Sequence, residues 1–265
     1  MKKIAQKRAM LIAIGILAII IVMLMFPEKE IPIQEVKQEE HQEESIPTKT
    51  EEQRVYVADT YNHRIQVFDK NGTFLSSFGS YGREESSLRM PTEVIEHQDK
   101  IYVLDKGNNK MKVFDKDYHF IFSFGDGLRY PLGFGIGNDK VYVTNTYESR
   151  IDAFSLDGKK LFSFGSRGKG EGQLRYASDV AVDDNSVYVI DTDNNRVQVF
   201  AHDGKYERTW GKFGSYMEKE QGMRFPLGIE VYENTVYVSD TQRSQVKMYA
   251  PDGTLKGIFG THGKG

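Results

Sequence analysis

The chain of 265 residues contains no cysteine and only one tryptophan. Without cysteine it has no disulfide, no thiol nucleophile, no cysteine ligand for zinc and no cysteine for lipid attachment. Its formal net charge of −3 gives no indication of the strongly basic surface that is typical of nucleic-acid binding. The fold must therefore be stabilised by packing alone.

Long hydrophobic runs are rare too, with one exception near the N-terminus. Residues 9–26 contain neither a charge nor a proline, and as a helix they would extend about 27 Å, close to the roughly 30 Å of a bilayer core. Four basic residues precede them, which favours a cytoplasmic N-terminus; they are Lys2, Lys3, Lys7 and Arg8. We expect residues 1–26 to form an uncleaved transmembrane signal anchor, with a cleaved secretory peptide as the alternative.

The next segment, residues 27–53, has nine glutamates, three lysines and three prolines and hardly any large apolar side chains. This composition predicts a disordered linker. A flexible chain of this length spans roughly 30 Å root mean square. The remaining residues, 54–265, are then expected to stand outside the cell, tethered to its membrane.

The tethered part is built from an internal repeat. The phrase VYVADT at residues 55–60 returns as IYVLDK, VYVTNT, VYVIDT and VYVSDT, starting at residues 101, 141, 187 and 236. Successive starts lie 46, 40, 46 and 49 residues apart, which is the period of a four-stranded propeller blade rather than of a helical repeat. The sequence therefore predicts an all-β propeller with five recognisable blades.

The strands of each unit follow from its own residues. Val55 and Val57, then Ile65 and Val67, alternate with polar residues as strands do, with a polar turn between them. A glycine-ended hairpin such as DKNG at 69–72 follows, then a further strand that ends in an aromatic–glycine pair such as Phe78-Gly79. A loop of the type LRMP then leads to the next blade's inner strand, which gives strands a to d from the axis outward.

The phrase ADTYNHRIQVF at residues 58–68 resembles the NHL-repeat β-propeller family, and the resemblance covers residues 54–265. The Gly-His and Trp-Asp signature of WD40 blades is absent. The copies depart from the family pattern at Asn145, Ala177 and Gln245. The resemblance implies a central channel and, most commonly, closure with six blades.

Strands b, c and d are predicted in five blades but strand a in only four, so the ring is predicted to be incomplete at the C-terminus. We favour truncation before a last blade; the alternative is an open arc or one that a partner strand completes. Residues 31–36 could supply a closing strand, but Pro32 interrupts them.

One arginine recurs in the loop before strand a, on the face to which the turns between strands b and c also belong. Planar guanidinium groups suit carboxylate or phosphate ligands, so this column is the candidate ligand-binding site, with inter-blade salt bridges as the structural alternative. The column consists of Arg89, Arg129, Arg175 and Arg224.

Two carboxylates, Glu93 and Asp179, begin alternate inner strands and are expected near the channel mouth, where they could hold a cation. An acid or amide also ends every strand b, and that recurrence indicates a structural role. The histidines share no common column, and the calcium-loop pattern at residue 191 fails because Arg196 and His202 replace its glycine and glutamate. No metal, cofactor or catalytic residue is predicted.

These observations favour a membrane-tethered, extracytoplasmic binding, sensor or scaffold module for a protein, peptide or glycan. One alternative is a metal-dependent enzyme that resembles the propeller lyases or lactonases, which would need His, Asp or Asn residues converging in the channel. The other is RNA binding, known in cytoplasmic NHL proteins, which would need a basic face and a cytoplasmic propeller. Whether the chain is an enzyme stays open.

Overall fold

The computed structural model describes residues 53–214 and 222–260. The predicted anchor, residues 1–26, and all but the last residue of the predicted linker lie outside this range. Within it, no helix has the length and apolar character needed to cross a membrane.

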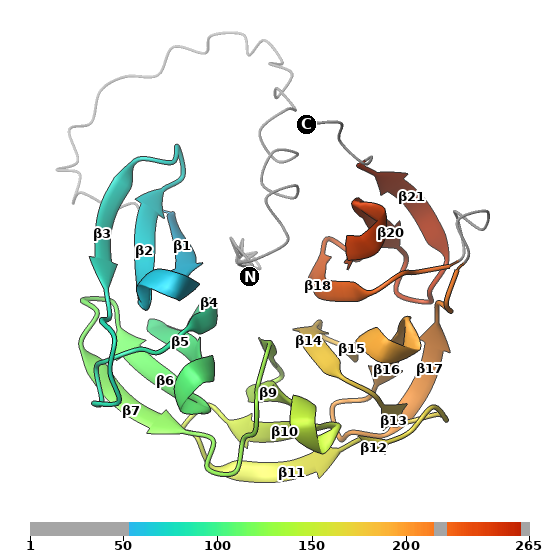
Figure 1. Cartoon of the computed structure of the whole chain (residues 1–265), viewed down its shortest axis with the longest axis horizontal. Helices are drawn as coiled ribbons and strands as arrows, with labels where there is room; N and C mark the ends of the chain where they lie inside the picture. The colour runs from blue at the N-terminus through green and yellow to red at the C-terminus, as the bar shows by residue number, and fades with distance from the viewer. Residues whose placement is uncertain (1–52, 215–221, 261–265) are drawn as a thin grey trace, which may run out of the picture.

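The described residues form five β-blades around one axis, with blades 1 and 5 at the two ends of the row (Figure 1). Blade 1 has three strands, and no described strand pairs with the inner edge of its first strand; they are β1 (Arg54–Asp59), β2 (Arg64–Asp69) and β3 (Phe74–Phe78). The other blades have four each. The predicted propeller with five blades is confirmed.

The bounds of the four-stranded blades are as follows. Blade 2 comprises β4 (Pro91–His97), β5 (Lys100–Asp105), β6 (Lys110–Asp115) and β7 (Phe120–Phe124), and blade 3 comprises β8 (Phe134–Gly137), β9 (Lys140–Asn145), β10 (Arg150–Ser155) and β11 (Lys160–Phe164). Blade 4 comprises β14 (Ala177–Val182), β15 (Val187–Asp191), β16 (Arg196–Phe200) and β17 (Tyr206–Trp210), and blade 5 comprises β18 (Pro226–Tyr232), β19 (Thr235–Asp240), β20 (Gln245–Tyr249) and β21 (Leu255–Phe259).

Within each blade the strands are antiparallel neighbours in chain order, and the register is the same from blade to blade. Strand c shifts its pairing with strand d at the same place in all five blades, for example between Val67 and Phe68 and between Val199 and Phe200. Such bulges bend and twist a strand. Because the register is conserved, residues at equivalent positions of different blades can be compared directly.

Blade 2 has Tyr118 where the other hairpins have glycine. Tyr118 adopts the left-handed conformation, with φ of 68°, which costs energy for a bulky residue. Its ring stacks on Phe78 of blade 1, with centroids 4.8 Å apart and planes 6° apart, and the Arg54 guanidinium donates to its hydroxyl at 3.0 Å. These contacts with blade 1 offset the backbone strain.

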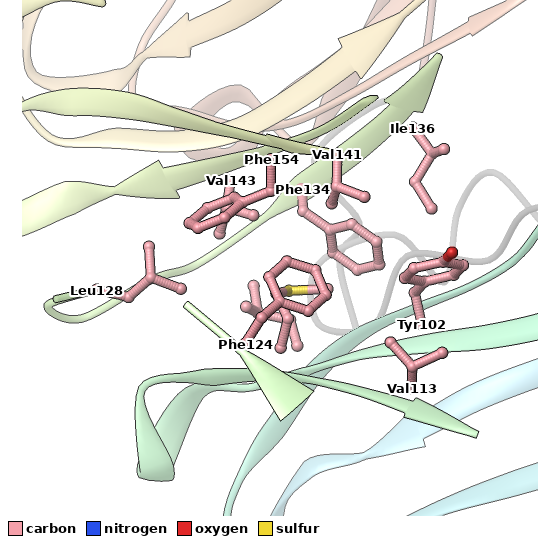
Figure 2. Close-up of a cluster of buried hydrophobic side chains, with 11 residues drawn as sticks. Tyr102, Val113, Phe124, Leu128, Phe134, Ile136, Val141, Val143 and Phe154 are labelled. Atoms are coloured by element: carbon pink, nitrogen blue, oxygen red, sulfur yellow. The ribbon is translucent and has the colours of Figure 1, made fainter. Parts of the chain in front are cut away.

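The core consists of layers between consecutive blades. Between blades 2 and 3, Tyr102, Phe124 and Leu128 face Phe134 and Val141 (Figure 2). Each large apolar side chain that is fully buried contributes about 1.5–3 kcal/mol. The single tryptophan, Trp210, belongs to an equivalent layer, as its position in the repeat predicts, and contacts Tyr188 and Tyr249.

Each turn between strands b and c is a short 3-10 helix, a detail that the sequence patterns did not predict; the five are η2 (Thr60–Asn62), η3 (Lys106–Asn108), η4 (Thr146–Glu148), η5 (Thr192–Asn194) and η6 (Thr241–Arg243). A parallel pair, β12 (Ser166–Arg167) with β13 (Gln173–Leu174), lies in the loop before blade 4. We call the side formed by these turns and by the loops that precede strand a the loop face. The opposite side, made of the a–b and c–d hairpins, is the hairpin face.

Candidate functional site

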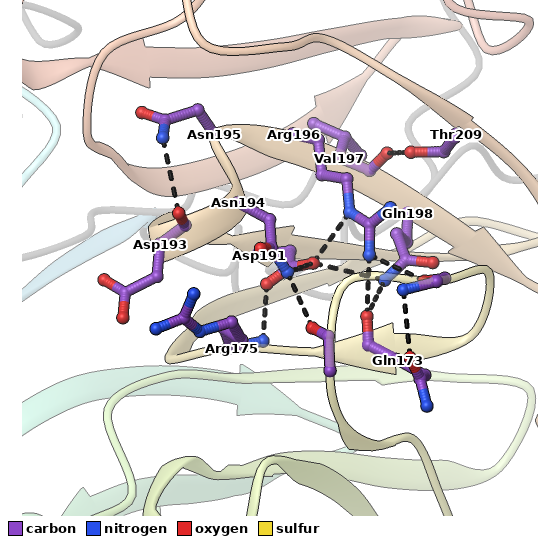
Figure 3. A network of polar contacts seen from close by, with 12 residues as sticks. Gln173, Arg175, Asp191, Asp193, Asn194, Asn195, Arg196, Val197, Gln198 and Thr209 are labelled. Atoms are coloured by element: carbon purple, nitrogen blue, oxygen red, sulfur yellow. Dashed lines mark hydrogen bonds and ion pairs between the residues drawn. The ribbon is translucent and has the colours of Figure 1, made fainter.

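The acid that ends strand b organises the loop face, as blade 4 illustrates (Figure 3). The Asp191 carboxylate is fully buried and accepts hydrogen bonds from the Arg175 backbone N–H at 2.7 Å, from Asn194 Nδ2 at 2.8 Å and from Arg196 Nε at 2.8 Å. Burial raises the pKa of Asp191, and these donors oppose the rise. The carboxylate thus fixes a loop and a turn to the blade.

Blade 3 makes the same network, but its acid and its amide have exchanged positions between strands b and c. Its strand b ends in Asn145, and the carboxylate comes from Asp152 on strand c, to which Asn145 Nδ2 donates at 2.7 Å. Arg150 Nε donates to that carboxylate at 2.8 Å. The departure from the family pattern at Asn145 is therefore compensated on the next strand.

Each arginine of the predicted column lies in a loop of the loop face, one for each of blades 2 to 5. Their backbone N–H groups donate to the network acid or amide of the same blade, at 2.7 to 2.9 Å. Their carbonyl oxygens accept from the 3-10 turns, namely from Gly107, Tyr147, Asp193 and Gln242, in the order Arg89, Arg129, Arg175 and Arg224.

The four guanidinium groups have different surroundings. Arg129 pairs with Glu148 of its own blade at 2.9 Å, and the guanidinium carbon of Arg224 lies 5.4 Å from the centre of the Phe213 ring. The side chains of Arg89 and Arg175 have no hydrogen-bond or ion-pair partner within residues 53–214 and 222–260. The column therefore does not act as one unit, and Arg89 and Arg175 are the members able to bind an external anion.

Exposed aromatic side chains gather on the loop face, and the sequence patterns did not single them out. Large rings with 36–79% exposure lie in the 3-10 turns or in the loops before strand a; they are Tyr61, Tyr81, Tyr130, Tyr147, Phe213 and Phe225. The remaining exposed aromatic residue of the described chain is Phe74, on the outer strand of blade 1. The described part of the hairpin face has none.

The residue after each column arginine is held in a left-handed backbone conformation. Tyr130, Tyr176 and Phe225 have φ between 55° and 58°, a strained state that often marks functional positions. Donation of the Tyr130 N–H to Asn109 Oδ1 at 2.9 Å and of the Phe225 N–H to Asn195 Oδ1 at 2.8 Å holds the state in place. Both acceptors belong to the preceding blade, so contacts between blades fix this conformation.

Three tyrosines form an aromatic cluster over blades 3 and 4. The rings of Tyr130 and Tyr147 meet edge to face at 5.2 Å, and Lys106 Nζ lies 4.5 Å from the centre of the Tyr130 ring. Burial, followed by the neighbouring phenol of Tyr130, raises the pKa of Tyr176 to about 12. We call Tyr130, Tyr147 and Tyr176 the tyrosine cluster.

The two predicted channel carboxylates are buried and bonded to the backbone of the following blade. Glu93 Oε2 accepts the Phe134 N–H at 2.7 Å, and Asp179 Oδ2 accepts the Ile229 N–H at 2.8 Å. Gly133 leaves room for the second acid, because a Cβ there would lie 2.2 Å from Asp179 Oδ1. Each carboxylate therefore connects two inner strands.

Burial raises the pKa of Asp179 to about 7. Burial also raises the pKa of Glu93 well above its usual range, and the nearby charge of Asp179 adds to this effect. Within the described ranges, the three potential metal ligands that cluster are Asp115, Asp117 and His119, far from the axis in a hairpin whose backbone N–H groups bond to Asp115. The inner strands thus place two buried carboxylates here, and the charge of Glu230 also lies near Glu93.

Comparisons with known proteins agree with this architecture. The family model described as NHL repeat matches residues 50–68 and 174–200. A 40-residue segment is 52% identical to Protein brain tumor of Drosophila melanogaster and covers 15% of this chain but only 4% of that protein.

Similar solved structures include two lyases and a nidogen/laminin complex. A streptogramin B lyase structure has a TM-score of 0.61 at 16% identity and is matched over 80% of this chain and 66% of its own. Virginiamycin B lyase from Staphylococcus aureus has a TM-score of 0.60 at 14% identity, with 81% and 69% covered. A chain of a nidogen/laminin complex has a TM-score of 0.53 at 15% identity, with 80% and 81% covered.

At these identities the structural likeness concerns the fold alone. The repeat match, by contrast, falls on the strand b–turn–strand c unit that carries the buried acid network in blades 1 and 4. The described chain is an all-β propeller of five blades and of the NHL-repeat type.

Proposed function

We propose that this propeller is a binding module whose loop face contacts a protein partner. The observation that carries the proposal is the segregation of exposed aromatic side chains to that face, together with its arginines. Tyrosine and arginine are enriched at the centres of protein interfaces. Exposed apolar groups gathered in this way mark interaction sites rather than ordinary surface.

The rigidity of the loop face also supports the proposal. The loops before strand a bond to the acid networks, and the left-handed residues bond to the preceding blade. A surface that is already ordered loses less conformational entropy when it binds. The tyrosine cluster adds large contact areas on side chains with few rotatable bonds.

The proposal includes a location at the cell membrane. The hydrophobic segment 9–26, the preceding basic residues and the acidic linker 27–53 favour an anchor with the propeller outside the cell. Protease digestion of intact cells tests this topology. Release of the propeller supports it, and protection of the propeller until the cells are lysed contradicts it.

Site-specific photo-crosslinking of the full chain tests the binding face. A photoreactive amino acid replaces Tyr147, which is 71% exposed in the tyrosine cluster, or, as the matched control, Phe74, which is 53% exposed on the rim of blade 1. We expect discrete protein adducts from position 147 and not from position 74. A second substitution, Tyr130→Ala, should reduce the yield at position 147.

Other outcomes would contradict a protein partner. Equal adducts from both positions would mean that the loop face is not selective. Adducts lost after ribonuclease treatment would favour RNA, and adducts lost after glycosidase treatment would favour a glycan. Turnover of a streptogramin by the full chain would favour the lyase alternative.

A further inference from the structure

A hollow of about 410 Å³ lies on the loop face over blade 2. Three cationic side chains, Arg83, Arg89 and Lys110, line it, together with the amides of Asn108 and Asn109; one acid, Glu85, faces them. Lys112 also lines the hollow, but its ammonium is 3.2 Å from the buried Asp105 carboxylate, which neutralises it. The remaining charge around the hollow is therefore positive.

Among the residues that line the hollow is Gly107, at the middle of the 3-10 turn of blade 2. The equivalent residues of the other blades are Tyr61, Tyr147, Asp193 and Gln242. A Cβ at Gly107 would come within 2.5 Å of the Arg89 carbonyl oxygen, so the turn lies directly on the backbone of that arginine. A side chain at this position would displace the wall of the hollow.

Blade 4 shows how the equivalent space is filled. There, one nitrogen of the Arg196 guanidinium donates to the carbonyl oxygens of Gly170 and Gln173, both at 2.8 Å (Figure 3). The equivalent residue of blade 2 is Lys110, and its ammonium pairs instead with Asp126, which is 96% exposed. In blade 2 the equivalent carbonyls, those of Glu84 and Ser87, accept from Lys112 instead, so Lys110 stays at the rim of the hollow.

The walls of the hollow are fixed before any ligand binds. Asn108 Nδ2 donates to the Gly82 carbonyl at 2.9 Å and to Asp105 at 2.7 Å. Lys112 Nζ donates to the Glu84 carbonyl at 2.8 Å, and also to that of Ser87. These bonds fasten the loop at residues 79–90 to blade 2, so Arg83 and Arg89 are mounted on an ordered backbone.

We infer that this hollow binds one oxyanion of an acidic peptide segment between the guanidinium groups of Arg83 and Arg89. Neither group has a hydrogen-bond or ion-pair partner in the described part of the chain, and guanidinium forks bind carboxylate and phosphate in the same planar manner. The space suits a single side chain. The inference rests on the proposed protein partner and specifies the chemistry of one of its contacts.

Peptide binding by the full chain, held in nanodiscs of uncharged lipid, tests the inference. Fluorescence anisotropy compares three versions of one labelled peptide, with glutamate, phosphoserine or glutamine at the same three positions. We expect the two charged versions to bind at least tenfold more tightly than the glutamine version, and less tightly as salt is added. The charged peptide that binds more tightly shows whether the hollow prefers a carboxylate or a phosphate.

Substitutions localise the contact. Arg83→Ala and Arg89→Ala should each weaken binding of the charged peptide about tenfold, and Gly107→Tyr, whose Cβ would meet the Arg89 carbonyl oxygen at 2.5 Å, should weaken it as well. Arg175→Ala is the matched control, because that guanidinium is also unpaired but stands over the filled space of blade 4; we expect less than a twofold change. Circular dichroism confirms that each variant is folded. If Arg89→Ala does not fold, Arg89→Lys, which lacks the planar guanidinium fork, takes its place.

Three results would overturn the inference. The first is equal affinity for the charged and glutamine peptides. The second is an equal loss of peptide affinity in Arg175→Ala and Arg89→Ala. The third is a single-stranded oligonucleotide that binds more tightly than either charged peptide and whose binding depends on Arg89. If Arg89→Ala leaves the adducts at position 147 intact and has no effect on the peptide, the inference fails while the proposed protein-binding face stands.

Discussion

The two faces of the propeller come from the same repeat but are stabilised in different ways. On the hairpin face, each turn is held by its own residues: Asp69 Oδ1, for example, accepts the backbone N–H groups of Asn71 and Thr73, both at 2.8 Å. On the loop face, the acid networks join loop, turn and strand, and residues such as Asn109 and Asn195 bond to the following blade. Hairpin turns therefore close on themselves and touch the preceding blade through a few contacts, such as Tyr102 Oη to the Leu156 carbonyl at 3.1 Å, whereas loop-face residues share one network.

This difference explains why exposed aromatic residues gather on one face. Hairpins of four residues favour glycine and aspartate for local reasons, which leaves little room for rings. The loop face can hold Tyr130 and Phe225 in left-handed conformations because neighbouring blades supply the hydrogen bonds. The following predictions test the comparison, from the largest expected effect to the smallest.

The first prediction concerns the acid network of blade 4. Asp191→Ala leaves the Arg196 guanidinium and three further donors without their buried acceptor, so we expect the free energy of unfolding to fall by about 3–5 kcal/mol. Urea denaturation measures the change. Asp203→Ala, in the exposed hairpin of the same blade, is the control and should have a much smaller effect; equal losses would mean that the two faces do not differ.

The second prediction concerns pH. The raised pKa of Asp179, about 7, means that the folded chain keeps a proton which the unfolded chain releases above about pH 4. Stability from this group is therefore fully present below about pH 4 and is lost as pH rises to 7, by on the order of 3 kcal/mol.

Asp179→Asn should reduce the measured pH dependence, because the amide oxygen still accepts a hydrogen bond but has no proton to lose; the part due to Glu93, whose pKa burial also raises, should remain. Denaturation at pH 4, 5.5 and 7 measures the slope. Asp157→Asn on the hairpin face should leave the slope over this range unchanged. A wild-type slope that Asp179→Asn does not alter would show that another group causes it.

The third prediction concerns the exchanged pair of blade 3. Asn145→Asp places a second carboxylate beside Asp152 and removes the donor that bonds to it at 2.7 Å, so we expect a loss of about 2 kcal/mol. Adding Asp152→Gln recreates the residues of blade 4 and should restore most of the stability. A double-mutant cycle measures the coupling; strictly additive effects would mean that the two residues do not form one network.

The fourth prediction separates binding from stability. Tyr147 is 71% exposed and has no part in the acid network, so Tyr147→Ala should change the free energy of unfolding by no more than about 0.5 kcal/mol. The same substitution should weaken partner binding about tenfold, as expected for an interface tyrosine. Phe74→Ala, on the blade rim, should alter neither quantity greatly; a larger effect on binding than that of Tyr147→Ala would shift the proposed interface to the rim.

The sequence predicts the blades well because each strand is fixed by local alternation and four of the five c–d hairpins by a glycine. It also indicates that the arginine loops and the b–c turns share a face. It does not indicate which arginines have partners, because Glu148 and Phe213 do not recur from blade to blade. Nor does it indicate the hollow, because the sequence does not show that Lys112 bonds to the loop carbonyls while Lys110 pairs with Asp126.

The exposed rings were missed for a related reason. Tyr130 and Phe225 follow an arginine in a recurring phrase that resembles the start of a buried strand, but both adopt the left-handed conformation and are exposed. A strand pattern assumes ordinary backbone angles, so it cannot indicate this conformation. The membrane anchor at residues 1–26 lies outside the described residues and stays a prediction.

The exchange of Asn145 and Asp152 has a consequence for finding such repeats. The family model matches the two blades that have an intact Asp–Arg–Gln set, Asp59 with Arg64 and Gln66, and Asp191 with Arg196 and Gln198. The other three blades have different residues at one or more of these positions but still surround one carboxylate with donors. A count based on the Asp–Arg–Gln set alone therefore finds only two of the blades, whereas asking which neighbouring side chains jointly supply one carboxylate and its donors recovers all five.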